Sequence, residues 1–179
     1  MYRKLKNCEL RRLTKEEFKQ TNKISVVLVL DNVRSQHNIG AAFRTADAFS
    51  LERVVLCGIC ATPPSPEIHK SALGAEESVD WVYNEDSLSA VRQLKEHGYK
   101  IVSIEQTEDS TMLNSVIIEE RGKYALVFGN EVKGVQQEVA DISDLVVEIP
   151  QFGTKHSLNV SVSIGIVIWE FVKIIKSLK

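Results

Sequence analysis

Hydrophobic and polar residues follow two different periods along this chain. Short, mainly apolar and β-branched runs predict strands, and these lie at Ile24–Leu30, Arg53–Cys57, Val79–Tyr83, Lys100–Glu105, Tyr124–Phe128 and Leu145–Ile149. Longer segments with apolar residues three or four positions apart predict helices, at Asn38–Phe49, Ser87–His97 and Leu158–Leu178, and less clearly at Glu67–Leu73 and Val135–Ala140. Strands that are apolar on both faces and alternate with helices predict an α/β fold with a mostly parallel sheet and helices on both faces.

The size and composition of the chain fit one domain. Its 179 residues are 44% hydrophobic and 26% charged, which suits a single hydrophobic core. The apolar run Ile164–Trp169 is far shorter than the roughly 20 residues that span a bilayer, and the charged N-terminus does not resemble a secretory signal. We therefore expect a cytoplasmic protein that does not enter a membrane. Three cysteines in a chain of this composition argue against a disulfide framework.

Charge is distributed unevenly, although the net charge is only −2. Residues 1–23 hold eight Lys and Arg against three acidic residues, whereas residues 24–179 have a net charge of −7. A capping box that begins at Thr14 predicts a short helix in the basic segment. We therefore expect a basic N-terminal arm, residues 1–23, attached to a domain of residues 24–179. Such an arm favours a polyanionic partner, and the alternative is a solvated terminus with no partner.

Polar and glycine-containing loops follow the predicted strands, where ligands bind in parallel sheets. The first loop leads to Asn38, Gly40 and Arg44. We expect Asn38 to be the N-cap of the next helix, with the free N–H groups of that helix suited to an anion. The alternative for Arg44 is an ordinary surface pair with Asp47, three residues further along. Neither glycine-rich nucleotide signature, Gly-x-Gly-x-x-Gly or the P-loop, occurs in the chain.

Two further loops carry groups that suit chemistry. Phe128–Gly134 places a carboxylate between two glycines after a buried strand, a pattern that is by itself typical of an ordinary turn. Ile149–Ser161 joins the last strand to the last helix. That helix begins with an unusual density of small polar residues, which would need hydrogen-bond partners if they were buried; they are Ser157, Asn159, Ser161 and Ser163.

Together these three segments resemble the SpoU-TrmH family of RNA ribose 2′-O-methyltransferases, in the SPOUT superfamily. The matching motifs are Asn38-x-Gly40-x-x-x-Arg44-Thr45-Ala46, Gly129-Asn130-Glu131-x-x-Gly134, Ile149-Pro150 and Ser157-Leu158-Asn159-Val160-Ser161. The resemblance extends from about Ile24 to the C-terminus. Gln151 stands where the family commonly has Met, and Ser163 stands where Ala is usual; both positions adjoin the expected cofactor loop.

The resemblance implies S-adenosylmethionine as the methyl donor, no metal, a deep C-terminal trefoil knot and a homodimer. It implies catalytic or substrate-positioning roles for Arg44, Asn38, Glu131, Ser157 and Asn159. It implies cofactor-binding roles for Gly129, Ile149, Leu158, Gln151 and Gly134. For Arg44 the family's proposed role is a general base; we favour a clamp on phosphate or alkoxide, because a guanidinium group resists deprotonation. RNA contacts are expected from Arg11, Arg12, Lys15 and Lys155.

Several alternatives stay open at this point. The chain could be a catalytically silent RNA-binding protein on the same fold, or a SPOUT enzyme that methylates a base. The compact size favours tRNA over rRNA as the substrate. Cys57 and Cys60 form a Cys-x-x-Cys pair, for which we expect packing at a strand end because no second pair follows. His37, His69, His97 and His156 show no metal-ligand spacing along the sequence.

Overall fold

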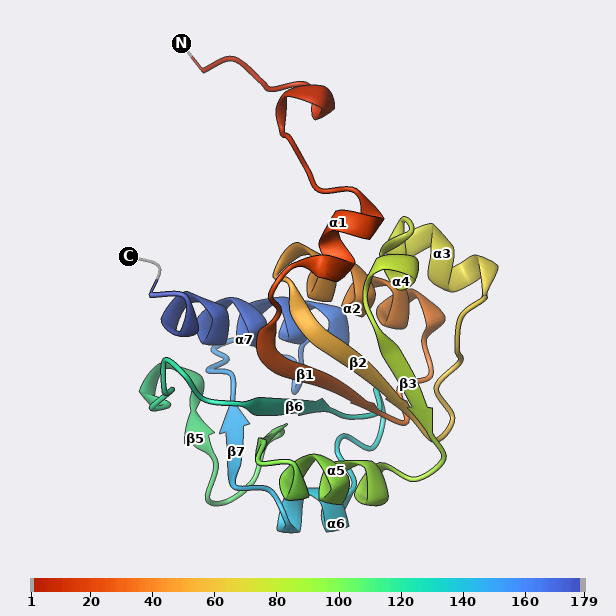
Figure 1. Ribbon diagram of the computed structural model, residues 1–179. Coiled ribbons are helices and arrows are strands. Elements are labelled where there is room, and N and C mark those ends of the chain that lie inside the picture. Colours follow the sequence, from red (N-terminus) through yellow and green to blue (C-terminus); the bar gives the residue numbers. More distant parts are fainter. Residues whose placement is uncertain (1, 178–179) are drawn as a thin grey trace.

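A computed structural model describes residues 2–177. Seven parallel strands form one sheet in the order β3-β2-β1-β6-β4-β7-β5, with helices on both faces (Figure 1). The strands are β1 (Ile24–Asp31), β2 (Leu51–Cys57), β3 (Trp81–Asn84), β4 (Lys100–Ile104), β5 (Thr111–Met112), β6 (Tyr124–Phe128) and β7 (Leu145–Glu148). The predicted α/β fold with a parallel sheet is confirmed.

The helices complete two covering layers. They are α1 (Lys15–Gln20), α2 (Gln36–Ala48), α3 (Pro66–Ala72), α4 (Ala75–Ser78), α5 (Ser87–Glu96), α6 (Gln137–Asp141) and α7 (Val160–Ile175), with short 3₁₀ turns at Asn7–Glu9 and Leu113–Ser115. The capping box that was predicted at Thr14 is present. The last helix begins two residues later than predicted, because Asn159 caps it; its predicted end, Leu178, lies outside the described residues.

Alternate residues of β1 supply two separate cores. Val26, Leu28 and Leu30 pack with α2, α3 and α7 on one face of the sheet. Val27 and Val29 pack with α5 and α6 on the other. All five side chains are completely buried, which is why the strand is apolar from Val26 to Leu30 instead of alternating with polar residues.

The last strand enters the sheet between two strands that precede it in sequence. β4 is followed along the chain by β5, yet β7 lies between them. β5 and α4 were not predicted, because two residues of strand and one turn of helix are too short to show a hydrophobic period. Val79 and Asp80, at the predicted start of the third strand, instead connect α4 to β3.

The N-terminal arm has two parts that differ in structure. Residues before α1 extend away from the domain (Figure 1). α1 packs against the domain through Phe18, whose side chain is buried, and Lys15 forms an ion pair with Glu77 of α4. Among the described residues no helix is long and apolar enough to cross a membrane.

Candidate functional site

A cavity of about 320 Å³ opens at the carboxyl ends of β4, β6 and β7. Three loops from distant parts of the sequence and the first turn of α7 form its walls. The sheet thus brings together all five residues that were predicted to bind the cofactor. The predicted cofactor-binding residues that line the cavity are Gly129, Gly134, Ile149, Gln151 and Leu158, and predicted catalytic residues Glu131 and Ser157 line it as well.

The loop between Gly129 and Gly134 is a tight hairpin that only glycine allows at its two ends. The backbone N–H groups of Asn130 and Gly134 each donate to the other's carbonyl oxygen, both at 2.9 Å. A Cβ atom on Gly129 would lie 2.0 Å from the carbonyl carbon of Gly134. Gly134 has a φ of +70° and no room for a side chain beside the Glu105 carboxylate. Backbone groups of this loop therefore form one wall of the cavity.

Two carboxylates at strand ends hold this hairpin in place, and the sequence analysis missed both. Glu105, after β4, accepts the N–H of Val135 at 2.9 Å. Asp31, at the end of β1, is completely buried and accepts both the N–H and the side-chain amide of Gln136 at 2.7 Å. In the sequence, each of these two residues is an acidic residue at the end of a mainly apolar run, and this pattern would have indicated them. Asp31, as a buried carboxylate with several donors, is well satisfied, so the hairpin is held firmly.

Glu131 ties the hairpin to the start of α2. Its carboxylate accepts the N–H groups of Arg34 and Ser35, both at 3.1 Å, and the side-chain amide of Asn38 at 3.0 Å. Partial burial raises the pKa of Glu131, but these hydrogen bonds outweigh burial and hold the pKa below its usual value. Glu131 is therefore ionised at neutral pH, beside a helix N-terminus that favours negative charge.

The prediction that Asn38 caps α2 is wrong. Ser35 is the N-cap, and its hydroxyl accepts the N–H of Asn38. Asn38 lies within the first turn, where its side chain is 5% exposed and reaches Glu131. Serine and asparagine are similarly good N-caps, and sequence spacing alone does not separate a cap from a polar residue three positions later. The contact between Asn38 and Glu131 nevertheless unites two of the predicted catalytic residues.

Within a single chain Arg44 does not lie beside this cavity, although the resemblance implies a catalytic role for it. It is exposed on α2 and faces a separate hollow of about 270 Å³, formed with α1, α3 and α4. Asp47 lines the same hollow. No side-chain hydrogen bond or ion pair joins Arg44 to Asp47 or to any other residue that the structure describes, so the alternative of an i,i+3 pair finds no support either.

The small polar residues at the start of α7 are exposed or half-buried, so they carry no buried polar group that lacks a partner. Asn159 is exposed, and its side-chain oxygen accepts the N–H and the hydroxyl of Ser161 at 2.9 and 2.6 Å. The Ser163 hydroxyl donates to the Asn159 carbonyl oxygen at 3.3 Å. Ser157 and Ser163 line the cavity, but Asn159 does not. These residues form a polar first turn at the cavity edge.

The predicted RNA-binding residues belong to two separate segments of the chain. Arg11 and Arg12 are exposed in the extended part of the arm, and Lys155 is exposed in the loop before α7. Lys15 is not free, because it pairs with Glu77.

The two cysteines of the Cys-x-x-Cys pair are buried in the core. Burial raises the pKa of the Cys57 thiol to about 12 and that of the Cys60 thiol to about 11. The Cys60 thiol donates to the Leu30 carbonyl oxygen at 3.3 Å. Metal binding and redox chemistry need thiolates, so these protonated thiols are packing residues, as predicted.

The fold and the cavity define an α/β domain with a ligand site at the carboxyl ends of its parallel strands. The sequence profile of the SpoU rRNA Methylase family matches residues 25–169. The chain therefore belongs to this family, and the resemblance stated from the motifs is confirmed.

Individual relatives agree with this assignment. The chain is 38% identical over 146 residues to the 23S rRNA (guanosine-2'-O-)-methyltransferase RlmB of Nitrosomonas europaea, covering 82% of this chain and 55% of that protein. A crystal structure of an A. aeolicus TrmH/SpoU tRNA modifying enzyme superposes with a TM-score of 0.80 and 25% identity, covering 91% of this chain and 81% of that one. An AdoMet-bound rRNA methyltransferase from Sinorhizobium meliloti has the same fold, with a TM-score of 0.77, 24% identity, and 90% and 60% coverage. The chain thus spans little more than half the length of the curated relative it matches.

Proposed function

We propose that this chain transfers a methyl group from S-adenosylmethionine to a ribose 2′-hydroxyl of RNA. The observation that carries the proposal is the cavity at the strand ends, whose hairpin wall is tied through Glu131 to Asn38 on α2. Membership in the SpoU rRNA Methylase family supports the reaction class.

The cavity suits the proposed methyl donor in size and charge. About 320 Å³ lies at the lower end of the range for small-molecule sites. Glu105, Glu131 and Glu148 line it, against one lysine, Lys133. An acidic lining favours a ligand with a sulfonium and an ammonium group. Main-chain groups of the hairpin and of the loop after β7 offer donors and acceptors for an adenine edge.

The proposed catalysis depends mainly on alignment. When bound, S-adenosylmethionine supplies an already activated methyl group. The chain must hold the ribose oxygen in line with it, and such orientation lowers a barrier by several kcal/mol. We assign Ser157 and Asn159 to positioning the ribose at the polar first turn of α7. We assign Arg44 to holding a phosphate or the developing alkoxide, where its planar fork of donors is suited to oxygen ligands.

The position of Arg44 implies that the active site combines two chains. α7 buries Ile164, Val167 and Phe171 on one side and leaves a second apolar stripe exposed; the stripe consists of Val162, Ile166 and Trp169, which are 48%, 38% and 48% exposed. We propose that a second copy covers this stripe in a symmetric dimer. α2 lies beside α7, with the rings of Phe49 and Trp169 6.1 Å apart, so the C-terminal end of α2 adjoins the proposed interface. We propose that the dimer also brings Arg44 of α2 to it. Each Arg44 would then serve the partner's cavity.

A C-terminal trefoil knot belongs to the same proposal. The insertion of β7 between β4 and β5 supports it, because the chain returns between segments that it has already formed. The loop after β7 then leads to α7, which packs on the side of the sheet that α2 covers. Knots are rare in proteins, so the expectation comes from the family resemblance, and the strand order agrees with it.

The substrate class is RNA, and we favour rRNA. The curated relative is a 23S rRNA enzyme, so the preference for tRNA that the compact size suggested is not confirmed. The basic arm remains our proposed RNA contact, through Arg11 and Arg12 in its extended part and Lys155 near the cavity. A cytoplasmic location stays a prediction.

Analysis of modified nucleosides tests the proposed reaction. Purified protein is incubated with RNA and S-adenosylmethionine that carries a deuterated methyl group, and the RNA is digested to nucleosides for mass spectrometry. We expect the label on ribose. Label on a base would replace the proposal with the base-methylating alternative. No label in either rRNA or tRNA, with RNA binding intact, would favour the silent RNA-binding protein.

A further inference from the structure

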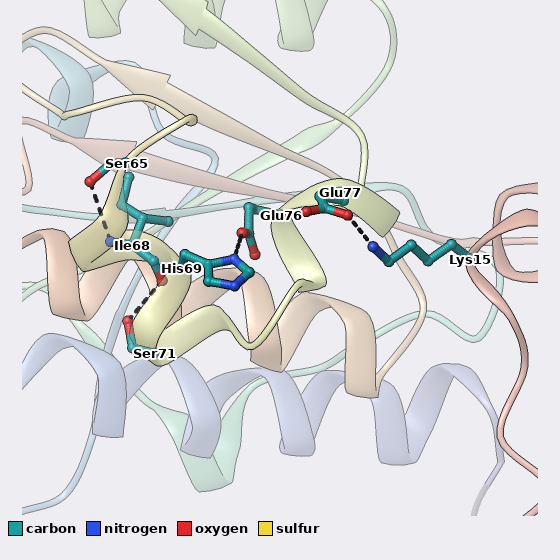
Figure 2. A network of polar contacts seen from close by, with 7 residues as sticks. All are labelled: Lys15, Ser65, Ile68, His69, Ser71, Glu76 and Glu77. Carbon is teal, nitrogen blue, oxygen red and sulfur yellow. Dashed lines mark hydrogen bonds and ion pairs between the residues drawn. The ribbon is translucent and has the colours of Figure 1, made fainter.

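A second cluster of chemically active side chains lies at the corner between α3 and α4. His69 is near the end of α3, and Glu76 and Glu77 are in α4. The chain reverses between them at Leu73 and Gly74, which both have positive φ angles, 54° and 90°. One ligand atom from each of the three residues lies within 4.8 Å of the others. Figure 2 shows Glu76 between His69 and Glu77.

Glu76 carries an oxygen that the protein leaves without a partner. Its side chain is only 8% exposed. One carboxylate oxygen lies 2.6 Å from Nδ1 of His69, and the other is completely buried without a hydrogen bond to any described residue. Buried carboxylate oxygens in folded proteins are nearly always satisfied by a donor, a water molecule or an ion. The unpartnered oxygen therefore points to a ligand.

We propose that His69, Glu76 and Glu77 bind a Zn²⁺ ion. Imidazole nitrogen and carboxylate oxygen are both normal zinc ligands, whereas Mg²⁺ and Ca²⁺ prefer sites built from oxygen alone. Two ligand atoms of a tetrahedral zinc ion lie about 3.3 Å apart. The Glu76 carboxylate already lies 2.6 Å from His69 through its other oxygen, so the two side chains need to move only slightly to share one ion. The imidazole is therefore what selects zinc over the hard cations.

The surroundings leave room for the fourth ligand. A cavity of about 500 Å³ adjoins the cluster and is lined by Trp81 and the proline-rich segment 63–66. Three protein ligands with an open position are typical of zinc sites that also hold water or a small ligand. No residue of this cavity lines the proposed cofactor cavity, so the zinc site and the proposed methyl transfer can be tested separately.

Lys15 competes for one of the proposed ligands. Its ammonium group forms an ion pair with Glu77 (Figure 2). Zinc must displace this cation to use the Glu77 carboxylate. Removing the lysine should therefore strengthen zinc binding, an effect that a purely structural ion-pair cluster would not produce.

The test measures Zn²⁺ binding by calorimetry to the untagged full chain, with no RNA or methyl donor present. All proteins carry Cys8→Ser, because the exposed Cys8 thiol could itself bind zinc. We expect one saturable Zn²⁺ per chain and no comparable binding of Mg²⁺. His69→Ala and Glu76→Gln should each weaken binding by at least about tenfold. His97→Ala, directly after α5, and Glu67→Gln, at an exposed position of α3 outside the proposed ligand set, should leave it unchanged.

Two further measurements belong to this test: zinc binding by a Lys15 variant, and thermal unfolding of every variant. Lys15→Ala should bind Zn²⁺ at least about twofold more tightly. Melting curves in a chelator confirm that each variant is folded; His69 is a safe position, because its side chain is 61% exposed. The proposal is overturned if the parent protein does not bind Zn²⁺ or if His69→Ala binds it equally well. Unchanged or weaker binding by Lys15→Ala would also overturn the assigned ligand set.

Discussion

Replacing Glu131 by alanine tests whether this carboxylate ties the cofactor hairpin to α2. The substitution removes the acceptor of three hydrogen bonds. The N–H groups of Arg34 and Ser35 lie at exposed or half-buried positions and can bind water instead. The Asn38 side chain is 5% exposed and loses its partner. Most of the cost should therefore come from the Asn38 amide.

The size of the effect follows from these three contacts. A buried donor without a partner costs about 1–3 kcal/mol, and each exchange of a protein contact for water costs about 0.5 kcal/mol or less. We expect the free energy of unfolding to fall by about 2 kcal/mol. In a chain of this size that corresponds to a melting temperature lower by about 4–8 °C.

The effect should depend on pH in a defined direction. The folded protein lowers the pKa of Glu131 below its ordinary value of 4.5. A carboxylate with a depressed pKa stabilises the fold above its unfolded pKa and loses that contribution as the pH falls through the folded value. The difference in stability between wild type and Glu131→Ala should thus be complete at neutral pH and narrow below pH 4.5.

Thermal unfolding at one fixed protein concentration measures the change. Glu138→Ala is the matched control, because Glu138 is exposed on α6, shortly after the same loop. The double variant Asn38→Ala with Glu131→Ala should cost less than the sum of the two single changes, since they remove one shared contact. A loss in Glu131→Ala no larger than in Glu138→Ala, or strict additivity with Asn38→Ala, would refute the proposed tie.

Three further predictions concern the cofactor, the dimer and the arm. S-adenosylhomocysteine at 100 times its dissociation constant should stabilise the fold by about 2.7 kcal/mol; no shift of the melting curve at millimolar concentration would contradict the cofactor site. Light scattering should give about 40 kDa, twice the chain mass, and about half of that for Trp169→Glu; a wild-type monomer would exclude the dimer. Deleting residues 1–22 should flatten the salt dependence of RNA binding, by about 0.7–0.9 in log–log slope per lost phosphate contact; an unchanged slope would place the RNA contacts elsewhere.

Hydrophobic periodicity predicted the core elements well because burial determines them. β6 is buried along its whole length, and β1 is buried at every position except the half-buried Ser25, so their apolar runs are unmistakable. β5 was missed because a two-residue strand at the sheet edge depends on its pairing with β7, a contact distant in sequence. Local pattern carries no information about such a pairing.

The sequence predicts which loops form the candidate site, but it does not predict which side chains in those loops contact one another. Topology alone brings the loops after β4, β6 and β7 together, and the motifs identified two of them. Which side chain caps a helix and which reaches across to another loop depends on packing, and so Asn38 was misassigned. The cluster around His69 was missed for a related reason: its members are seven and eight positions apart, and only the reversal at Leu73 and Gly74 makes them neighbours.

A heterodimer of two inactive variants tests most directly whether two chains build one active site for ribose methylation. Arg44→Ala removes the proposed clamp, and Leu158→Arg places a cation in the wall of the acidic cavity. Each homodimer should lose at least about 10²-fold in methyl transfer. The two variants are co-expressed with different tags, and tandem purification isolates the mixed dimer.

In the mixed dimer, the Leu158→Arg chain can still supply Arg44 to the intact cavity of its partner. One of the two sites is then complete, and methyl transfer should return to about half of the wild-type rate per dimer. The wild-type dimer with the same two tags is the control. A mixed dimer as inactive as its parents would show that Arg44 does not serve the partner's cavity and would contradict the proposed composite site.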